Sequence, residues 1–176
     1  MRKIVATIHI RAISPRASRG VLCLGALRLP CRLGRSGIRF GKREGDGATP
    51  AGSWRMIEVL YRAGRLFPPR TALPVRPIAA ALGWCDAAGD RNYNQPVSLP
   101  YPASHEVIAR ADSLYDIIVL LSHNRLPRIQ GLGSAVFFHL TAVPADVTAG
   151  CVAITRNDML KVLQYCGPRT RLRVWP

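Results

Sequence analysis

Two residues able to do covalent chemistry lie close together in the C-terminal part of the chain. His139 is near the end of the apolar run SAVFFHL, and Cys151 begins the next run, CVAIT, after a polar, turn-forming segment. An unperturbed cysteine, with a pKa of about 8.5, is only a few per cent thiolate at neutral pH. Pairing with a protonated histidine lowers that pKa and makes the sulfur a good nucleophile. The pair predicts nucleophilic catalysis by Cys151 with His139 as its base; a structural histidine and cysteine in a β core are the alternative.

The residues just before Cys151 suit the same chemistry. Gly150 lacks a Cβ, so a substrate carbonyl can approach the backbone, where nearby N–H groups can form an oxyanion hole. Thr148 can hold the turn through a hydroxyl-to-backbone hydrogen bond. The segment TAGC therefore predicts a nucleophile at the end of a tight turn.

The elements on either side must bring the thiol and the imidazole together. Period-two alternation in SAVFFHL places Phe138 on one face of a strand and His139 on the other. A turn containing Pro144 and Asp146 then returns the chain, so that Cys151 begins the neighbouring strand. Two adjacent strands would hold the two side chains within hydrogen-bond reach.

The remaining pattern is that of a mainly β domain. Apolar segments alternate with glycine and proline every eight to twelve residues, which is typical of short strands joined by turns. The predicted strands are KIVATIHI, the hairpin GVLCLGALRLPC with its turn at Gly25, WRMIEVLY, YDIIVLLSH, SAVFFHL, CVAIT and TRLRVW. Residues 34–54 and 65–104 are too rich in proline and glycine for regular helix and are predicted as long loops.

One or two short α-helices are expected. TRNDMLKVLQYCG has Thr155 and Asp158 at capping-box spacing, an apolar side, and Gly167 with Pro168 as a stop signal. SHEVIARADSLYD, residues 104–116, is the second candidate.

Length and composition predict a single domain over residues 1–176. The chain is 48% hydrophobic, and its apolar runs are far shorter than the roughly 18–20 residues of a membrane span. IVATIHI near the N-terminus is interrupted by a histidine and followed by Arg11, so it is predicted as a first strand and not a signal peptide.

The formal charge of +15 favours a polyanionic partner. Nucleic acid, anionic lipid and a carboxylate-rich wall polymer all fit that charge, and a merely solvated basic surface is the plainer interpretation. No nucleic-acid-binding motif accompanies the scattered arginines, so nucleic-acid binding is not predicted.

The five cysteines contain no C-x-x-C pair and no zinc-finger spacing, so no metal site is predicted. A disulfide between Cys23 and Cys31 across the hairpin stays open. Other catalytic classes lack their motifs: papain-like hydrolases place the cysteine before the histidine, and neither G-x-S-x-G nor G-x-x-x-x-G-K-[ST] occurs.

Taken together, the sequence motifs of the chain resemble those of the L,D-transpeptidase catalytic domain of the YkuD type. That family's hallmark is a histidine at a strand end followed by S/T-x-G-C, here His139 and the TAGC of 148–151. GKREGDGATPAGSW at 41–54 resembles the family's G-x-x-x-G-D-x-x-T-P-x-G segment, in which Asp46, Thr49, Pro50 and Gly52 are expected to be mainly structural. RADSLYDIIVLLSHN and GLGSAVFFH resemble one proteobacterial branch, so the resemblance covers nearly the whole chain.

Two departures from the family pattern concern substrate binding. The commonest pattern has glycine after the histidine and arginine two residues after the cysteine, where this chain has Leu140 and Ala153. Binding of a substrate carboxylate is then expected from Arg156, Arg125 or a residue of the long loops.

The resemblance implies a mixed β-sandwich or barrel-like fold and acyl transfer on peptidoglycan stem peptides. Cys151 would attack the bond between the L-centred third residue and the terminal D-Ala of a tetrapeptide stem, with His139 as base and then acid. The thioester would pass to an amine of a second stem and cross-link the wall; water as acceptor would make the site an L,D-carboxypeptidase. The resemblance implies no metal or organic cofactor. It does imply inhibition by carbapenem-type β-lactams and a periplasmic or cell-envelope location.

Further side chains are candidates for the substrate cleft. His123 and Asn124 could line it or orient the substrate, and the loop residues Trp84, Tyr93 and Asn94 are candidate walls for a sugar-peptide ligand. The rival outside enzymology is a non-catalytic, basic peptidoglycan-binding module, which predicts an inert Cys151.

Overall fold

The computed structural model describes residues 3–141 and 147–176. Fourteen strands and one helix lie in these residues; the predicted turn at Pro144 and Asp146 lies outside them. The elements are β1 (Thr7–Ala12), β2 (Arg19–Leu24), β3 (Leu27–Arg32), β4 (Ile38–Arg39), β5 (Thr49–Pro50), β6 (Gly52–Tyr61), β7 (Val75–Pro77), β8 (Leu82–Cys85), β9 (Pro96–Ser98), β10 (His105–Val107), β11 (Ile117–Leu121), β12 (Phe137–Leu140), β13 (Val152–Ile154), α1 (Arg156–Leu163) and β14 (Arg171–Trp175).

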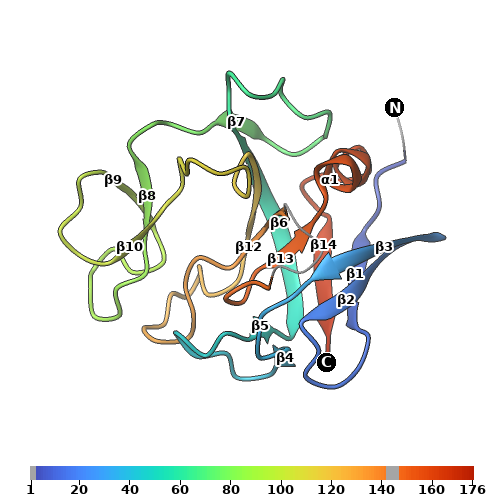
Figure 1. Ribbon diagram of the computed structural model, residues 1–176, viewed down its shortest axis with the longest axis horizontal. Helices are drawn as coiled ribbons and strands as arrows, with labels where there is room; N and C mark the ends of the chain where they lie inside the picture. Colours follow the sequence, from blue (N-terminus) through green and yellow to red (C-terminus); the bar gives the residue numbers. More distant parts are fainter. Residues whose placement is uncertain (1–2, 142–146) are drawn as a thin grey trace.

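The main sheet closes on itself. Its strand order is β11-β12-β13-β3-β2-β1-β14-β6-β7, and a further pairing of β6 with β11 joins the two sides into a barrel-like sheet. Figure 1 shows β8, β9 and β10 as a separate lobe beside it, and these three strands form their own antiparallel sheet. The mainly β, barrel-like fold expected from the sequence is confirmed.

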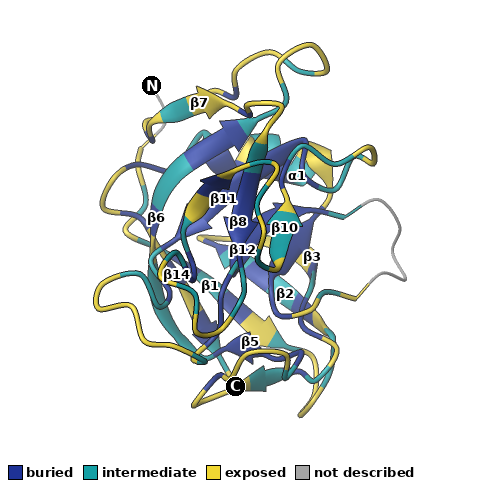
Figure 2. Cartoon of the chain, turned by 90° about the vertical axis from the view of Figure 1, so that its left-hand side faces the viewer, coloured by how far each residue is buried: buried dark blue, intermediate teal, exposed yellow. Residues whose placement is uncertain are grey.

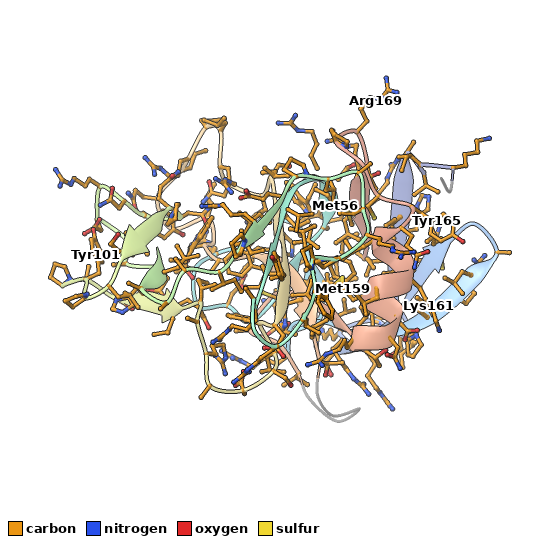
Figure 3. All side chains as sticks on the ribbon, turned by 90° about the horizontal axis from the view of Figure 1, so that it is seen from above. Met56, Tyr101, Met159, Lys161, Tyr165 and Arg169 are labelled. Atoms are coloured by element: carbon orange, nitrogen blue, oxygen red, sulfur yellow. The ribbon has the colours of Figure 1, made fainter. Side chains whose placement is uncertain are left out.

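Alternation along the strands separates two apolar clusters. Val119 of β11 and Phe138 of β12 belong to the larger one, whereas Ile118 and Phe137 belong to the smaller one. All of β11 is therefore buried, as the dark blue strand in Figure 2 shows. Figure 3 shows Met56 of β6 and Met159 of α1 among the side chains of the larger cluster.

The hairpin of β2 and β3 and the helix follow from local signals. The hairpin turns at Gly25, whose φ of 57° is the left-handed conformation that glycine adopts without strain. Thr155 caps α1 by accepting a hydrogen bond from the Asp158 N–H, as predicted. The helix ends at Leu163, earlier than the predicted stop at Gly167.

Two expectations are corrected. The candidate helix at 104–116 is wrong, because its first residues form β10, which pairs with β8, and turns follow. The long loops at 34–54 and 65–104 are not structureless, since they contain β4, β5, β7, β8 and β9. These strands have only two to four residues each, too short for a period-two signal.

Candidate active site

A cavity of about 300 Å³ opens on the outer side of the sheet, at the ends of β12 and β13. His139 and Cys151 both line it, as do Gly150, Thr148 and Ala153. The strand pairing explains this meeting: β12 and β13 run in parallel, with His139 opposite Ala153, two residues beyond Cys151. The sequence-predicted pair therefore shares one pocket, but among the described residues no hydrogen bond joins the thiol to the imidazole, contrary to the expectation from the sequence.

Cys151 is fixed through its backbone carbonyl. Thr148 donates a hydroxyl hydrogen bond of 2.7 Å to this oxygen, the kind of bond expected from the sequence. Thr49 donates a second of 3.3 Å, and its own hydroxyl accepts the Gly34 N–H at 2.8 Å. The TAGC and GDGATPAG segments are thus parts of one structure that sets the position of the nucleophile.

The Cys151 thiol is held by the backbone beside β12. Sγ donates to the Ala135 carbonyl and accepts from the Phe137 N–H, both at 3.2 Å. The residue is only 8% exposed, and burial raises the pKa of the thiol to about 12, although the Phe137 N–H opposes that shift. This direction is the opposite of the lowered pKa expected from a thiolate–imidazolium pair.

His139 is buried as well, at 6% exposure, and is neutral. Burial lowers its pKa to about 4, despite hydrogen bonds to backbone carbonyls. Its Nδ1 lies 2.8 Å from the Leu140 carbonyl oxygen, which can only accept, so Nδ1 carries the ring proton. Nε2 is left as the proton acceptor that a general base needs.

Gly150 is required by close packing of the backbone. Its φ is 141°, and a Cβ at this position would lie 2.7 Å from the Ala48 carbonyl oxygen. Its N–H donates to Thr148 Oγ1 at 3.2 Å and so serves the turn. Because the Gly150 N–H is already used in this way, an oxyanion hole would have to be formed by other N–H groups of the segment, and that role stays a prediction.

Lys42 brings a buried positive charge to the pocket. It is 6% exposed, its ammonium group pairs with Asp46, and Nζ donates to the Arg43 carbonyl at 2.8 Å. A Cβ built on Gly150 would lie 3.4 Å from Lys42 Cε, so the lysine passes directly beside the turn that carries the nucleophile. Its charge lowers the pKa of Cys151, against the larger effect of burial.

A basic side chain also faces the pocket from the neighbouring strand. Ala153 pairs with Arg32 of β3 on one side and with His139 on the other. Directly paired residues point to the same face of a sheet, so His139, Ala153 and Arg32 form one row, and all three line the pocket. Within the described residues, the Arg32 guanidinium has no hydrogen-bond or ion-pair partner.

The predicted residues Asn94, His123 and Asn124 lie behind the pocket and are not part of its lining. Asn94 Oδ1 accepts from the Ala135 N–H at 3.2 Å, and its Nδ2 donates to the Asn124 carbonyl at 2.7 Å. Ala135 is also the residue whose carbonyl holds the Cys151 thiol, so Asn94 acts on the nucleophile through it. His123 Nε2 donates to the Leu132 carbonyl at 3.0 Å, and Asn124 Oδ1 accepts from the Ile129 N–H at 2.8 Å.

Trp84, Tyr93 and Arg156 are likewise outside the lining. Trp84 and Tyr93 are almost fully buried; the indole of Trp84 packs edge-on to Phe137, 5.1 Å between ring centroids. Arg156 pairs with the buried Asp116 at 2.7 Å. Arg125, the other expected carboxylate ligand, stacks over Trp84 at 5.2 Å.

Sequence reasoning missed most charged groups of the pocket. The lining contains four basic and three acidic side chains that had no assigned role there: Arg32, Arg35, Lys42, Arg110, Glu44, Asp86 and Glu106. Lys42 lies inside the GKREGD segment, but at a position that the family pattern leaves unspecified. Arg32 gave no signal, because its pairing with β13 joins positions more than one hundred residues apart.

A sequence model of the L,D-transpeptidase catalytic domain, YkuD, matches residues 23–174. The chain belongs to this family. The match contains both Cys151 and His139 and the whole pocket described above. L,D-transpeptidases of this family use a cysteine on peptidoglycan stem peptides and generally act in the cell envelope. None of the curated proteins is detectably similar in sequence.

Two solved structures are similar to this L,D-transpeptidase-family chain. Bd1075 of Bdellovibrio bacteriovorus gives a TM-score of 0.48 at 14% identity, covering 96% of this chain and 47% of the other. L,D-transpeptidase 1 of Mycobacterium tuberculosis gives 0.40 at 14% identity, covering 96% and 61%. The chain thus spans about half to three fifths of the length of these two proteins.

Three further kinds of feature, metal clusters, disulfides and membrane-spanning helices, are absent from the residues that the structure describes. In residues 3–141 and 147–176, no three histidine, cysteine or acidic side chains are placed to hold a metal ion. All five cysteines, Cys23 and Cys31 included, are free thiols. No helix in the same residues is long and apolar enough to cross a membrane.

Proposed function

We propose that the protein is a peptidoglycan L,D-transpeptidase that uses Cys151 as nucleophile and His139 as acid–base. The observation that carries this proposal is the shared pocket: a thiol and a neutral imidazole on adjacent parallel strands, in a chain of this family. The donor is a tetrapeptide stem, and the bond broken joins its L-centred third residue to the terminal D-Ala.

The reaction begins from two neutral groups. The thiol proton, which is donated to the Ala135 carbonyl in the resting structure, turns toward His139, and Nε2 takes it as Sγ attacks the carbonyl carbon. Charge therefore develops on the reacting groups only as the reaction proceeds. When the C–N bond breaks, His139 returns the proton to the leaving D-Ala amine and a thioester remains. An amine of a second stem then attacks the thioester, His139 takes its proton, and the proton passes to the departing sulfur.

Lys42 and Arg32 would stabilise the two negative charges of this reaction, the one that develops near Cys151 and the carboxylate of the donor. The ammonium of Lys42, beside the Gly150 turn, stabilises negative charge developing near Cys151. The unpartnered Arg32 guanidinium, one strand beyond Ala153, binds the carboxylate of the donor's D-Ala. Arg32 thus provides the positive charge that Ala153 does not.

The same reaction implies a location, an inhibitor class and a hydrolytic side activity. Because substrate is part of the wall, the protein acts in the periplasm or cell envelope. A carbapenem-type β-lactam would acylate Cys151, since its ring carbonyl presents the same target to the thiol. Water in place of the acceptor amine would give L,D-carboxypeptidase activity from the same thioester.

The test is product analysis with a purified disaccharide-tetrapeptide. Mass spectrometry is expected to find a cross-linked dimer that has lost one D-Ala, and Cys151→Ala is expected to form none. Tripeptide alone would assign the hydrolytic activity. Untouched substrate with a folded enzyme, together with alkylation of Cys151 no faster than that of the other thiols, would favour the non-catalytic wall-binding module.

A further inference from the structure

The charge of the chain is divided unevenly along its sequence. All ten acidic residues lie between positions 44 and 158, where ten lysines and arginines balance them. Residues 1–43 and 159–176 contain the other fifteen basic residues and no acidic one. The net charge of +15 therefore belongs entirely to the two ends of the chain.

The fold brings these two ends side by side. β1 pairs with β2 on one side and with β14 on the other, so the first and last strands are neighbours. Figure 1 shows β1, β2, β3 and β14 together on the side of the molecule opposite the lobe of β8–β10. The charge that is split in the sequence is continuous in the structure.

The outward side of these strands is a surface of arginines, here called the basic face. Residues such as Ile8, Leu22 and Leu172 point into the core, and the alternate positions point outward. These outward positions, with one from β6, provide the basic face: Arg11, Arg19, Arg28, Arg32, Arg55, Arg171 and Arg173.

Cross-strand pairing sets like charges against each other on this face. Arg19 pairs with Arg32, and Arg171 pairs with Arg55. Like charges in directly opposite positions destabilise a sheet by a few tenths of a kcal/mol up to about 1 kcal/mol. Folding alone does not favour this arrangement, whereas a bound polyanion would offset the repulsion.

The basic face also has no carboxylate partners. Within the described residues, none of its seven arginines is in a salt bridge, whereas Arg65, Arg76, Arg110 and Arg156 elsewhere all are. Arg28 and Arg171 bond backbone carbonyls, and Arg11 and Arg173 lie over Trp175. Their positive charge is left uncompensated and accessible.

The basic face continues into the catalytic pocket. Two shallow hollows of about 370 and 430 Å³ lie on it, and both are lined by Arg28. The second is also lined by Arg19 and by Arg32, which lines the pocket itself. Arg19, Arg32, Ala153 and His139 form one cross-strand row, and strands lie about 4.8 Å apart, so the row leads to the imidazole within about 15 Å.

We propose that the basic face, apart from Arg32, which belongs to the catalytic pocket, is a second, non-catalytic binding site for carboxylate-bearing peptidoglycan, which it holds beside the pocket. The choice of polymer rests on the proposed function; the anionic nature of the ligand rests on the face alone. The indole of Trp175 on this face has the guanidinium groups of Arg173 and Arg11 over it at 4.0 and 5.4 Å and stacks with the imidazole of His9, so it is not free to stack on nucleic-acid bases.

The experiment is co-sedimentation with insoluble peptidoglycan in the Cys151→Ala background, which removes turnover. The face variant is R19Q/R28Q/R173Q, and the matched control is R70Q/R91Q/R128Q, three exposed arginines outside the basic face with the same loss of charge. The face variant is expected to lower the association constant roughly ten-fold or more at 0.15 M salt and to flatten its salt dependence, and the control to change it less than about two-fold.

Two results would overturn the inference. Equal losses in both triple variants would mean that net charge and not the basic face binds the wall. Stronger face-dependent binding of duplex DNA or anionic vesicles than of peptidoglycan would assign the face to another polyanion.

Turnover of a soluble disaccharide-tetrapeptide, with Cys151 intact, separates this inference from the proposed function. The face variant is expected to keep wild-type turnover, which also shows that it is folded, because Arg32 is unchanged. Face-dependent sedimentation without turnover in the wild type would reject the proposed reaction and leave the binding site standing. A parallel loss of soluble turnover in the face variant would overturn a separate site.

Discussion

Arginines serve opposite purposes at the two sides of this molecule. Beside α1 and β11, Arg65 and Arg156 clamp the carboxylate of Asp116, which is 1% exposed. On the basic face, Arg19 faces Arg32 and Arg171 faces Arg55, with no acid between them. A charge that is compensated inside the protein stabilises the fold, and a charge that is left uncompensated is available for a ligand.

The largest effect on stability is expected from breaking the compensated side. Asp116→Ala leaves Arg65 and Arg156 without their shared carboxylate and should lower the free energy of unfolding by about 2–4 kcal/mol. The loss is expected to be smaller than for a fully buried ion pair because water still reaches both arginines. Urea denaturation at neutral pH measures the change. Asp90→Ala is the control, because this half-buried turn carboxylate accepts hydrogen bonds from the Asn92 N–H and the Tyr101 hydroxyl and is in no salt bridge among the described residues. Equal losses in both variants would show that the two arginines bound to Asp116 add no stability beyond that of an ordinary hydrogen-bonded carboxylate.

A pH dependence of stability is expected from His139. Its pKa is about 4 in the folded protein and about 6.5 in the unfolded chain, so the unfolded state binds more protons between these values. Stability is therefore full above pH 6.5 and falls by about 3 kcal/mol as the pH drops toward 4. His139→Gln should flatten this part of the curve, with His105→Gln, at a half-buried position of β10, as the control; an unchanged curve in H139Q would contradict the neutral imidazole.

Arg32 lies where the basic face meets the catalytic pocket, so its substitution tests the binding of the donor carboxylate. Arg32→Gln should raise KM for the soluble tetrapeptide about ten-fold with a smaller change in kcat, because a charge-assisted hydrogen bond to the donor carboxylate is lost. R32K should restore part of the affinity. A donor whose terminal carboxylate is amidated should bind wild type and R32Q alike, and discrimination by R32Q as strong as by wild type would remove the assignment.

The smallest effect is a gain. Arg19→Gln removes the like-charge pair with Arg32 and should raise the free energy of unfolding by a few tenths of a kcal/mol in low salt, less in high salt. Thermal unfolding at two salt concentrations measures it, with R70Q as the reference. A loss of stability in R19Q would contradict the predicted repulsion between Arg19 and Arg32.

The sequence predicted what local patterns encode. Alternation of apolar and polar residues predicted the strands from Thr7 to Leu24 and from Val152 onward. Capping chemistry predicted the cap at Thr155, and the TAGC motif predicted that His139 and Cys151 share a pocket. The short strands of the lobe, the neutral state of Cys151 and the place of Arg32 did not follow. Each of these depends on burial or on a pairing between distant segments, which no local window contains.

The pairing of β1 with β14 also sets an order on folding. The last strand, Arg171–Trp175, lies between β1 and β6, so neither of those strands has its final neighbour until the C-terminal residues are free to pair. Until β14 is synthesised and free to pair, the sheet stays open along the edges of β1 and β6. Closure of the barrel therefore depends on a contact between segments more than 150 residues apart.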